Sequence, residues 1–176
     1  MNFQDTQLIG VLARAESTVS SLSSLLGGLV EKFAARGYSL YLVGGSVRDA
    51  LLGRLGNDLD FTTPARPEVV KEILDEWAET VWDTGIDFGT VSAAYKGQQI
   101  EITTFRSDSY DGQSRNPEVV YGDTLEGDLV RRDFKANAMA IELLADASFK
   151  FHDPLHGLQD IADRVLDTPD KPEISF

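Results

Sequence analysis

Two aspartates two residues apart, Asp58 and Asp60, are the residues of this sequence whose types and spacing most clearly suggest chemistry. On a β-strand, residues at this spacing point to the same face, while Leu59 and Phe61 point into the core. Two neighbouring carboxylates repel each other unless a cation lies between them. Mg²⁺ is usually held by one or two carboxylates together with phosphate oxygens. The pair therefore predicts a Mg²⁺ (or Mn²⁺) site, with an ordinary surface strand as the alternative.

A glycine pair, Gly44 and Gly45, precedes the aspartates and separates an expected strand from an expected helix. Glycine lets the backbone approach a ligand closely, and a helix N-terminus presents unpaired N–H groups and the positive end of its dipole. Arg48, one turn into that helix, can pair with the same anion through its guanidinium, and Ser46 adds a hydroxyl. A tight strand-to-helix turn would also explain the glycines, but their position beside the aspartate pair favours a phosphate-binding turn.

A third candidate carboxylate is Glu101, which lies between Ile100 and Ile102. The alternation places it on the polar face of a strand, so a neighbouring strand could bring it beside the aspartates. A solvated strand glutamate is the alternative. Farther along, Arg131 and Arg132 form a basic pair on an expected helix, although such a pair by itself usually faces solvent.

The elements that carry these residues follow from the spacing of apolar residues. Helical spacing runs from Val19 to Phe33, and Gly37 suits the end of that helix. Further helices are expected over 47–52, over 129–136 and from Pro67 to Trp77. Strands are expected over 39–43, 58–61, 90–95, 99–105, 140–144 and 149–152. This order predicts an α+β fold with a mixed sheet flanked by helices.

Composition limits the class of protein. The 176 residues suit one domain, or one domain and part of a neighbour. Apolar residues make up 42% and charged residues 26%, which is typical of a soluble globular protein. The absence of cysteine excludes disulfides. No apolar run approaches the roughly 20 residues that span a bilayer, and no secretory signal is visible. We therefore expect a cytoplasmic protein with no membrane contact.

Two other features of the chain complete this picture. The polar segment 107–123 is rich in turn-forming residues and is expected to be a long, mobile loop. Sixteen basic and 29 acidic residues give a net charge of −13. Affinity for a phosphate backbone comes from Lys and Arg. The charge therefore argues against a chain that binds RNA by itself, and any RNA-binding surface is expected to lie largely elsewhere.

Three motifs, in order, resemble the tRNA CCA-adding and poly(A) polymerase family, in its class II branch. They are GGSVRDALLGRLGNDLD over 44–60, EITTFR over 101–106 and RRDFKANAMA over 131–140. The resemblance extends from about Tyr38 to Asp167. It implies a nucleotidyltransferase head domain of the DNA polymerase β type over 18–165. A poorly ordered lead-in over 1–17 would precede this domain, and the start of a truncated helical neck over 166–176 would follow it.

The same resemblance implies roles for individual residues. Asp58 and Asp60 would be magnesium ligands, and Glu101 would be the supporting carboxylate. Gly45, Arg48 and Arg132 would contact the incoming nucleotide, together with the Gly44 turn. Two departures from the family pattern are Lys135-Ala136, where Thr-Ile is usual, and Phe88, where many relatives have His.

The implied reaction is nucleotidyl transfer from CTP and ATP to the 3′ end of tRNA, with release of pyrophosphate. Poly(A) synthesis is an alternative within the family. Another is a truncated nucleotide-binding module that is inactive alone. In the family, base selection depends on an acidic pair followed by an arginine in the neck, and this chain has no such pattern.

Overall fold

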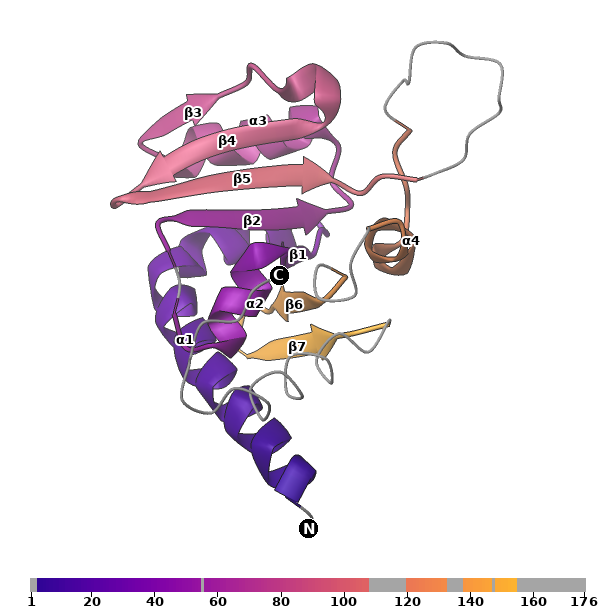
Figure 1. Ribbon diagram of the computed structural model, residues 1–176. Helices are drawn as coiled ribbons and strands as arrows, with labels where there is room; N and C mark the ends of the chain where they lie inside the picture. Colours follow the sequence, from indigo (N-terminus) through magenta and orange to yellow (C-terminus); the bar gives the residue numbers. More distant parts are fainter. Residues whose placement is uncertain (1–2, 55, 108–119, 133–137, 147, 155–176) are drawn as a thin grey trace.

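The chain forms a seven-stranded sheet in the computed structural model, which describes residues 3–54, 56–107, 120–132, 138–146 and 148–154 (Figure 1). The strands are β1 (Leu40–Val43), β2 (Asp58–Thr63), β3 (Thr80–Trp82), β4 (Thr90–Tyr95), β5 (Gln98–Thr104), β6 (Ala140–Leu143) and β7 (Phe149–His152). Their order across the sheet is β3-β4-β5-β2-β1-β6-β7. β2 and β5 are parallel, and the other neighbours are antiparallel. The expected mixed sheet is therefore confirmed.

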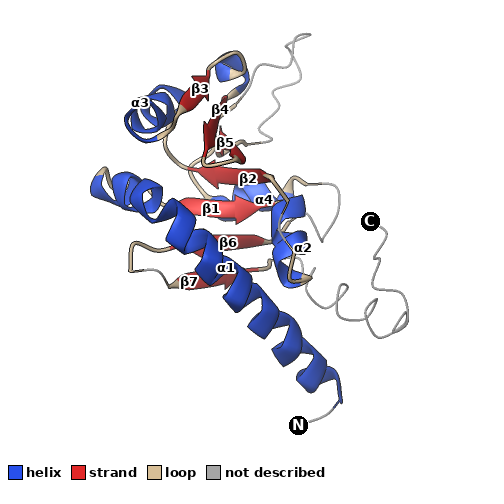
Figure 2. Ribbon diagram, turned by 90° about the vertical axis from the view of Figure 1, so that its left-hand side faces the viewer, coloured by secondary structure: helices blue, strands red, loops and turns tan. Residues whose placement is uncertain are grey.

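The helices cover the two faces of the sheet unequally. They are α1 (Phe3–Ala35), α2 (Gly45–Leu51), α3 (Pro67–Trp77) and α4 (Leu125–Val130), with a 3₁₀ turn, η1 (Ile86–Phe88). Side chains of α1, α2 and α3 share one apolar core with β1, β2, β4, β5 and β6. Figure 2 shows α1 crossing β1, β6 and β7 on this face. A smaller core joins α4 to the opposite face, through Leu129, Val43 and Ala140. The expected α+β class is confirmed.

Alternation along β2 separates the apolar core from the polar face. Leu59 and Phe61 are each 1% exposed and pack against the helices, whereas Asp58 and Asp60 are exposed on the other face. This is the pattern that the sequence predicts for a half-buried strand. The same alternation in β5 buries Ile100 and Ile102 and leaves the residue between them exposed.

The N-terminal segment differs from the expectation. Residues 1–17 were expected to form a poorly ordered lead-in, but α1 begins at Phe3 and continues without a break to Ala35. Among the α1 side chains that the structure describes, those that enter the core begin at Val19. The apolar residues Leu8, Val11, Leu12 and Ala15 continue the helical spacing of Val19 toward the N-terminus, and the sequence interpretation missed this signal. Among the described residues, no helix is long and apolar enough to cross a bilayer.

The region after β5 also corrects two expectations. The helix expected over 129–136 is α4, which begins at Leu125 because the hydroxyl of Thr124 accepts a hydrogen bond from Gly127 N at 3.1 Å. It ends at Val130, so Arg131 and Arg132 follow the helix and do not lie on it.

Before β5, the short edge strand β3 (Thr80–Trp82) was also not expected from the sequence.

The segment expected to be a mobile loop, 107–123, is described only at its ends. Residues 108–119 lie outside the described structure. At the ends, Ser107 N donates to Val120 O at 2.8 Å, and Gly122 N donates to Phe105 O at 2.7 Å. These two bonds bring the beginning and the end of the segment together beside β5. Its mobility remains a prediction.

Candidate active site

A glycine turn joins β1 to α2. Gly44 has φ 64° and ψ −140°, a conformation that side-chain-bearing residues rarely adopt. Its carbonyl oxygen accepts hydrogen bonds from Val47 N at 3.1 Å and Arg48 N at 3.4 Å, which form the first turn of the helix. The chain therefore reverses sharply here.

Two guanidinium groups lie over the two glycines. Arg48 Nη2 lies 3.2 Å from the point that a Cβ atom of Gly45 would occupy, and Arg132 Nη1 lies 3.9 Å from the corresponding point on Gly44. A side chain on Gly45 would therefore press on Arg48. The four residues predicted to bind nucleotide lie together, although Arg132 comes from a distant part of the sequence.

The turn is tied to the aspartate strand by a hydrogen bond. Ser46, at the start of α2, is 4% exposed, and its Oγ accepts a hydrogen bond from Asp60 N at 3.0 Å. The bond joins α2 to β2 at the position of the second aspartate. Ser46 was expected to offer a hydroxyl donor to a ligand. Its oxygen accepts this main-chain N–H and can still donate its own hydrogen, so the expected role remains a prediction.

Strand pairing places Glu101 beside Asp60. In the parallel pair β2 and β5, Asp60 is directly opposite Glu101, and Asp58 is opposite Gln99. Side chains at directly opposed positions point to the same face. The prediction that Glu101 lies on a strand next to the aspartates is therefore confirmed in its register. Its role as a supporting ligand remains a prediction.

The electrostatics of Asp60 reflect this crowded position. Although Asp60 is exposed at the strand surface, partial burial of its carboxyl group raises the pKa; the guanidinium of Arg132 lowers the pKa, and the charge of Asp58 raises it. The net effect is a raised pKa. The ionised form of Asp60 therefore lacks enough compensating positive charge in the protein alone, which is the situation that a bound cation would relieve.

A buried carboxylate, Asp128, organises the arginines of this site. It is 0% exposed; its Oδ1 accepts from Arg106 N at 2.8 Å and from Arg131 Nη2 at 3.4 Å, and its Oδ2 accepts from Arg132 Nη2 at 3.2 Å. The sequence interpretation missed this residue. The available signal was its spacing of three and four residues before the two arginines, which is typical of ion pairs around a helical turn.

The candidate ligands fit a magnesium ion that also binds phosphate. Asp58 and Asp60 offer hard carboxylate oxygens on one exposed strand face, next to a turn suited to phosphate. Within the described residues, no three His, Asp or Glu side chains lie close enough to hold a metal ion together, and this includes Asp58, Asp60 and Glu101. Mg²⁺ does not need such a group of three, because it usually retains waters and binds one or two carboxylates plus substrate phosphates.

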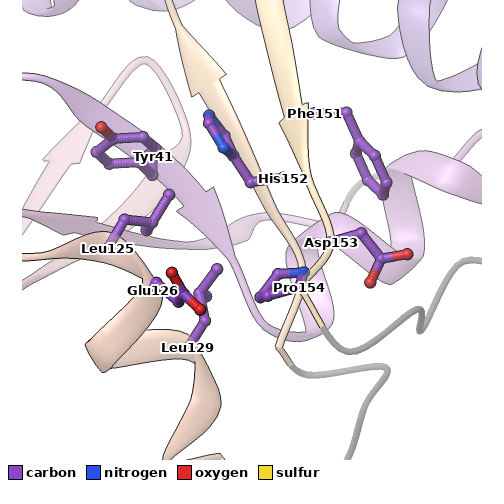
Figure 3. Close-up of a pocket in the computed structure, with 8 residues that line it drawn as sticks. All are labelled: Tyr41, Leu125, Glu126, Leu129, Phe151, His152, Asp153 and Pro154. Atoms are coloured by element: carbon purple, nitrogen blue, oxygen red, sulfur yellow. The ribbon is translucent and has the colours of Figure 1, made fainter.

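A separate open cavity of about 540 Å³ lies between α4 and strands β1 and β7 (Figure 3). Its lining includes Tyr41, Leu125, Leu129 and His152, and none of the predicted site residues. His152 Nε2 lies 3.1 Å from Glu142 Oε1 on the neighbouring strand. This contact is consistent with His152 as a strand-end residue, as the sequence predicts.

Comparison with known proteins identifies the class of this fold. Residues 40–167 match the model of the poly(A) polymerase head domain family. The match covers most of the chain, so the chain belongs to the poly(A) polymerase head domain family. This confirms the resemblance that the three sequence motifs indicated.

The individual relatives bear a more specific name. The chain is 44% identical over 130 residues to a CCA-adding enzyme of Listeria innocua, which is 73% of this chain and 31% of that protein. It is 37% identical over 158 residues to a CCA-adding enzyme of Staphylococcus saprophyticus, which is 89% of this chain and 38% of that protein. The chain therefore spans about a third of the length of these relatives.

Solved structures agree with these relatives. The crystal structure of the Bacillus stearothermophilus CCA-adding enzyme in complex with CTP superimposes with a TM-score of 0.64 at 37% identity, over 81% of this chain and 32% of that one. A tRNA nucleotidyltransferase complexed with a primer tRNA and an incoming ATP analogue gives a TM-score of 0.60 at 29% identity, over 83% of this chain and 37% of that one.

Proposed function

We propose that this chain is the catalytic head of a tRNA nucleotidyltransferase that adds CCA, from CTP and ATP, to the 3′ end of tRNA. The observation that carries the proposal is the position of Asp60 directly opposite Glu101, with Asp58 on the same face and the Gly44 turn alongside. The relatives named CCA-adding enzyme, and the related structures with CTP or with a primer tRNA, support it.

In this proposal the nucleotide binds through its triphosphate. Gly44 and Gly45 allow phosphate oxygens to approach the backbone, and Arg48 and Arg132 lie over them with their guanidinium groups. Charge-assisted hydrogen bonds from guanidinium to phosphate are strong and directional. These contacts orient the α-phosphorus toward the exposed carboxylates of β2 and β5.

Asp58 and Asp60 would hold Mg²⁺ or Mn²⁺, with Glu101 as the supporting carboxylate. When bound, the metal supplies positive charge that stabilises an ionised hydroxyl and the negative charge of the triphosphate. The 3′ oxygen of the RNA forms a bond to the α-phosphorus as the bond to the bridging oxygen breaks. Pyrophosphate leaves, and the proton of the 3′ hydroxyl passes to solvent.

The tRNA is proposed to bind mostly outside this chain. The net charge of −13 leaves little to attract an RNA backbone. We assign residues 18–165 to the head domain and 166–176 to the start of the neck, where base selection would begin. A cytoplasmic location follows from tRNA as the substrate.

Activity can be tested in the full-length protein that contains this chain, on tRNAs whose 3′ ends lack all or part of CCA. The proposal expects CMP, CMP and AMP to be added in that order, followed by a stop. Continued addition of AMP alone would instead establish poly(A) polymerase activity.

Binding can be tested in the chain itself, by calorimetry with CTP, ATP, GTP and UTP in the presence of Mg²⁺. We expect similar, weak affinities for all four, because the proposed contacts are with the triphosphate, which every nucleotide shares. A tenfold preference for CTP and ATP, about 1.4 kcal/mol, would show that the head selects the base. Failure of all four to bind would contradict the proposal.

A further inference from the structure

Asp128 occupies an unusual position for a carboxylate, because it is 0% exposed and contacts three arginine residues. A buried carboxylate is costly unless it is paired and fully hydrogen-bonded. Here both oxygens are used, and the donors come from two separate segments of the chain. One is the main chain after β5, and the other is the turn after α4.

The arginines around Asp128 repel one another. Burial lowers the pKa of the Arg106 guanidinium, and the charges of Arg131 and Arg132 lower it further, while Asp128 opposes this effect. In the described structure, the Nε atoms of all three arginines are enclosed and have no hydrogen-bond partner. Three arginines around one carboxylate leave the group with a net positive charge, and Asp128 holds it together.

The two oxygens of Asp128 contact two different segments at the candidate site. Oδ2 holds Nη2 of Arg132 at 3.2 Å, and the other terminal nitrogen of Arg132, Nη1, lies near the Gly44 turn. Oδ1 holds Arg106 N at 2.8 Å, directly after the strand that carries Glu101. Asp128 therefore fixes the position of Arg132, which lies beside the glycine turn, relative to β5, which carries Glu101.

We propose that Asp128 is a positioning residue for the nucleoside triphosphate, acting through Arg132. The inference rests on the proposed function, because it concerns the same phosphate site. Asp128 fixes one edge of the Arg132 guanidinium and so directs the rest of that group toward the glycine turn. It does not itself contact the nucleotide, since its carboxylate would repel the phosphates.

The variant Asp128→Asn separates positioning from simple support of the fold. The amide oxygen of Asn can still accept the hydrogen bond from Arg106 N, which preserves the link to β5. Its NH₂ group would then face the Arg132 guanidinium, donor against donor. The fold is kept, whereas the charge and the acceptor that orient Arg132 are lost.

The experiment is a double-mutant cycle that follows CTP binding by calorimetry in Mg²⁺. It compares the wild-type chain, Asp128→Asn, Arg132→Gln and the double variant. We expect Asp128→Asn to raise the Kd about tenfold, a difference of 1.4 kcal/mol. The double variant should bind no more than about twofold more weakly than Arg132→Gln, because a residue that acts through Arg132 has nothing to position once Arg132 is gone. Asp123→Asn is the matched control, since Asp123 pairs with Arg66 but its side chain is 92% exposed.

Three results would overturn the inference while leaving the proposed function intact. The first is a wild-type Kd in Asp128→Asn, whatever its thermal stability. The second is full additivity in the double variant, which would mean that Asp128 acts independently of Arg132. If Asp128→Asn does not fold, Asp128→Glu decides, because its longer carboxylate keeps the charge but displaces Arg132. Its Kd should rise while its circular dichroism spectrum stays unchanged, and an unchanged Kd is the third result. A wild-type chain that binds no triphosphate overturns the proposed function, and this inference with it.

Discussion

Asp60 and Glu101 lie directly opposite each other on the parallel strands β2 and β5. Neighbouring strands are about 4.8 Å apart, so two carboxylates are held on one face at close range. Like charges at this separation destabilise the protein unless positive charge compensates them. Arg132 supplies part of that compensation at Asp60. A metal ion that also binds phosphate would supply the rest.

Asp60 should be essential for catalysis. We expect Asp60→Ala to lower kcat/KM by about a thousandfold or more in the full-length protein, which is about 4 kcal/mol of transition-state stabilisation. The measurement is the rate of CMP incorporation into tRNA that lacks CCA. Asp75→Ala is a suitable control, because Asp75 pairs with Lys71 on the surface of α3. Near-normal activity of Asp60→Ala would exclude the proposed metal site.

Glu101 should contribute less than either aspartate. Glu101→Gln removes the charge but keeps the shape, and we expect a smaller loss of kcat because Glu101 is the supporting ligand. The rates should be compared at saturating Mg²⁺ and at limiting Mg²⁺, where the difference from wild type should widen. Glu68→Gln, on the exposed side of α3, provides the control. A loss as large as that of Asp60→Ala would reverse this ranking.

Gly44 should not tolerate a side chain. Its φ of 64° and ψ of −140° would cost alanine about 1–3 kcal/mol of folding free energy. Urea unfolding of Gly44→Ala, together with CTP titration, should show both lower stability and weaker binding. Gly10→Ala is the matched control: Gly10 lies in α1 with open space around it, so alanine should stabilise the helix by up to about 1 kcal/mol. Equal effects of the two substitutions would contradict the argument.

Ser46 should support the aspartate strand. Ser46→Ala removes the acceptor of Asp60 N, and an unsatisfied donor at this partly buried position should cost about 1–3 kcal/mol of stability. Chemical unfolding measures this loss directly. The exposed Ser21, whose hydroxyl donates to Ser17 O on its own helix, provides a control in which Ser→Ala should have little effect. If Ser46→Ala leaves stability unchanged, this hydrogen bond does not hold α2 to β2.

Asp60 should also make stability depend on pH. Its pKa is raised in the folded state, so the folded chain binds this proton more tightly than the unfolded chain. The contribution of Asp60 is therefore favourable at low pH and is lost as the pH rises through the folded pKa. Asp60→Asn should raise the Tm at pH 7 in the absence of metal, with a gain that shrinks toward pH 4. A lower Tm of Asp60→Asn at pH 7 would show that the pair with Arg132 outweighs burial.

The local chemistry of the site was predictable from the sequence. A period of two along β2 is sufficient to put Asp58 and Asp60 on one face and Leu59 on the other. The glycine pair predicts a sharp turn between β1 and α2, because it occurs where the apolar pattern changes from strand to helix. These inferences depend on neighbouring residues, whose backbone geometry is set by local sterics and by the partition of side chains between core and water.

The relationships between distant segments were decided by tertiary structure. Nothing in the local pattern specifies that β2 pairs with β5 in parallel, which is what brings Glu101 opposite Asp60. The contact of Asp128 with Arg106 N was equally invisible. Strand order and register minimise the exposed apolar area of the whole domain, and a buried carboxylate finds its partners only after that packing has formed. The sequence by itself therefore determined which residues could act, and the assembled fold decided which of them act together.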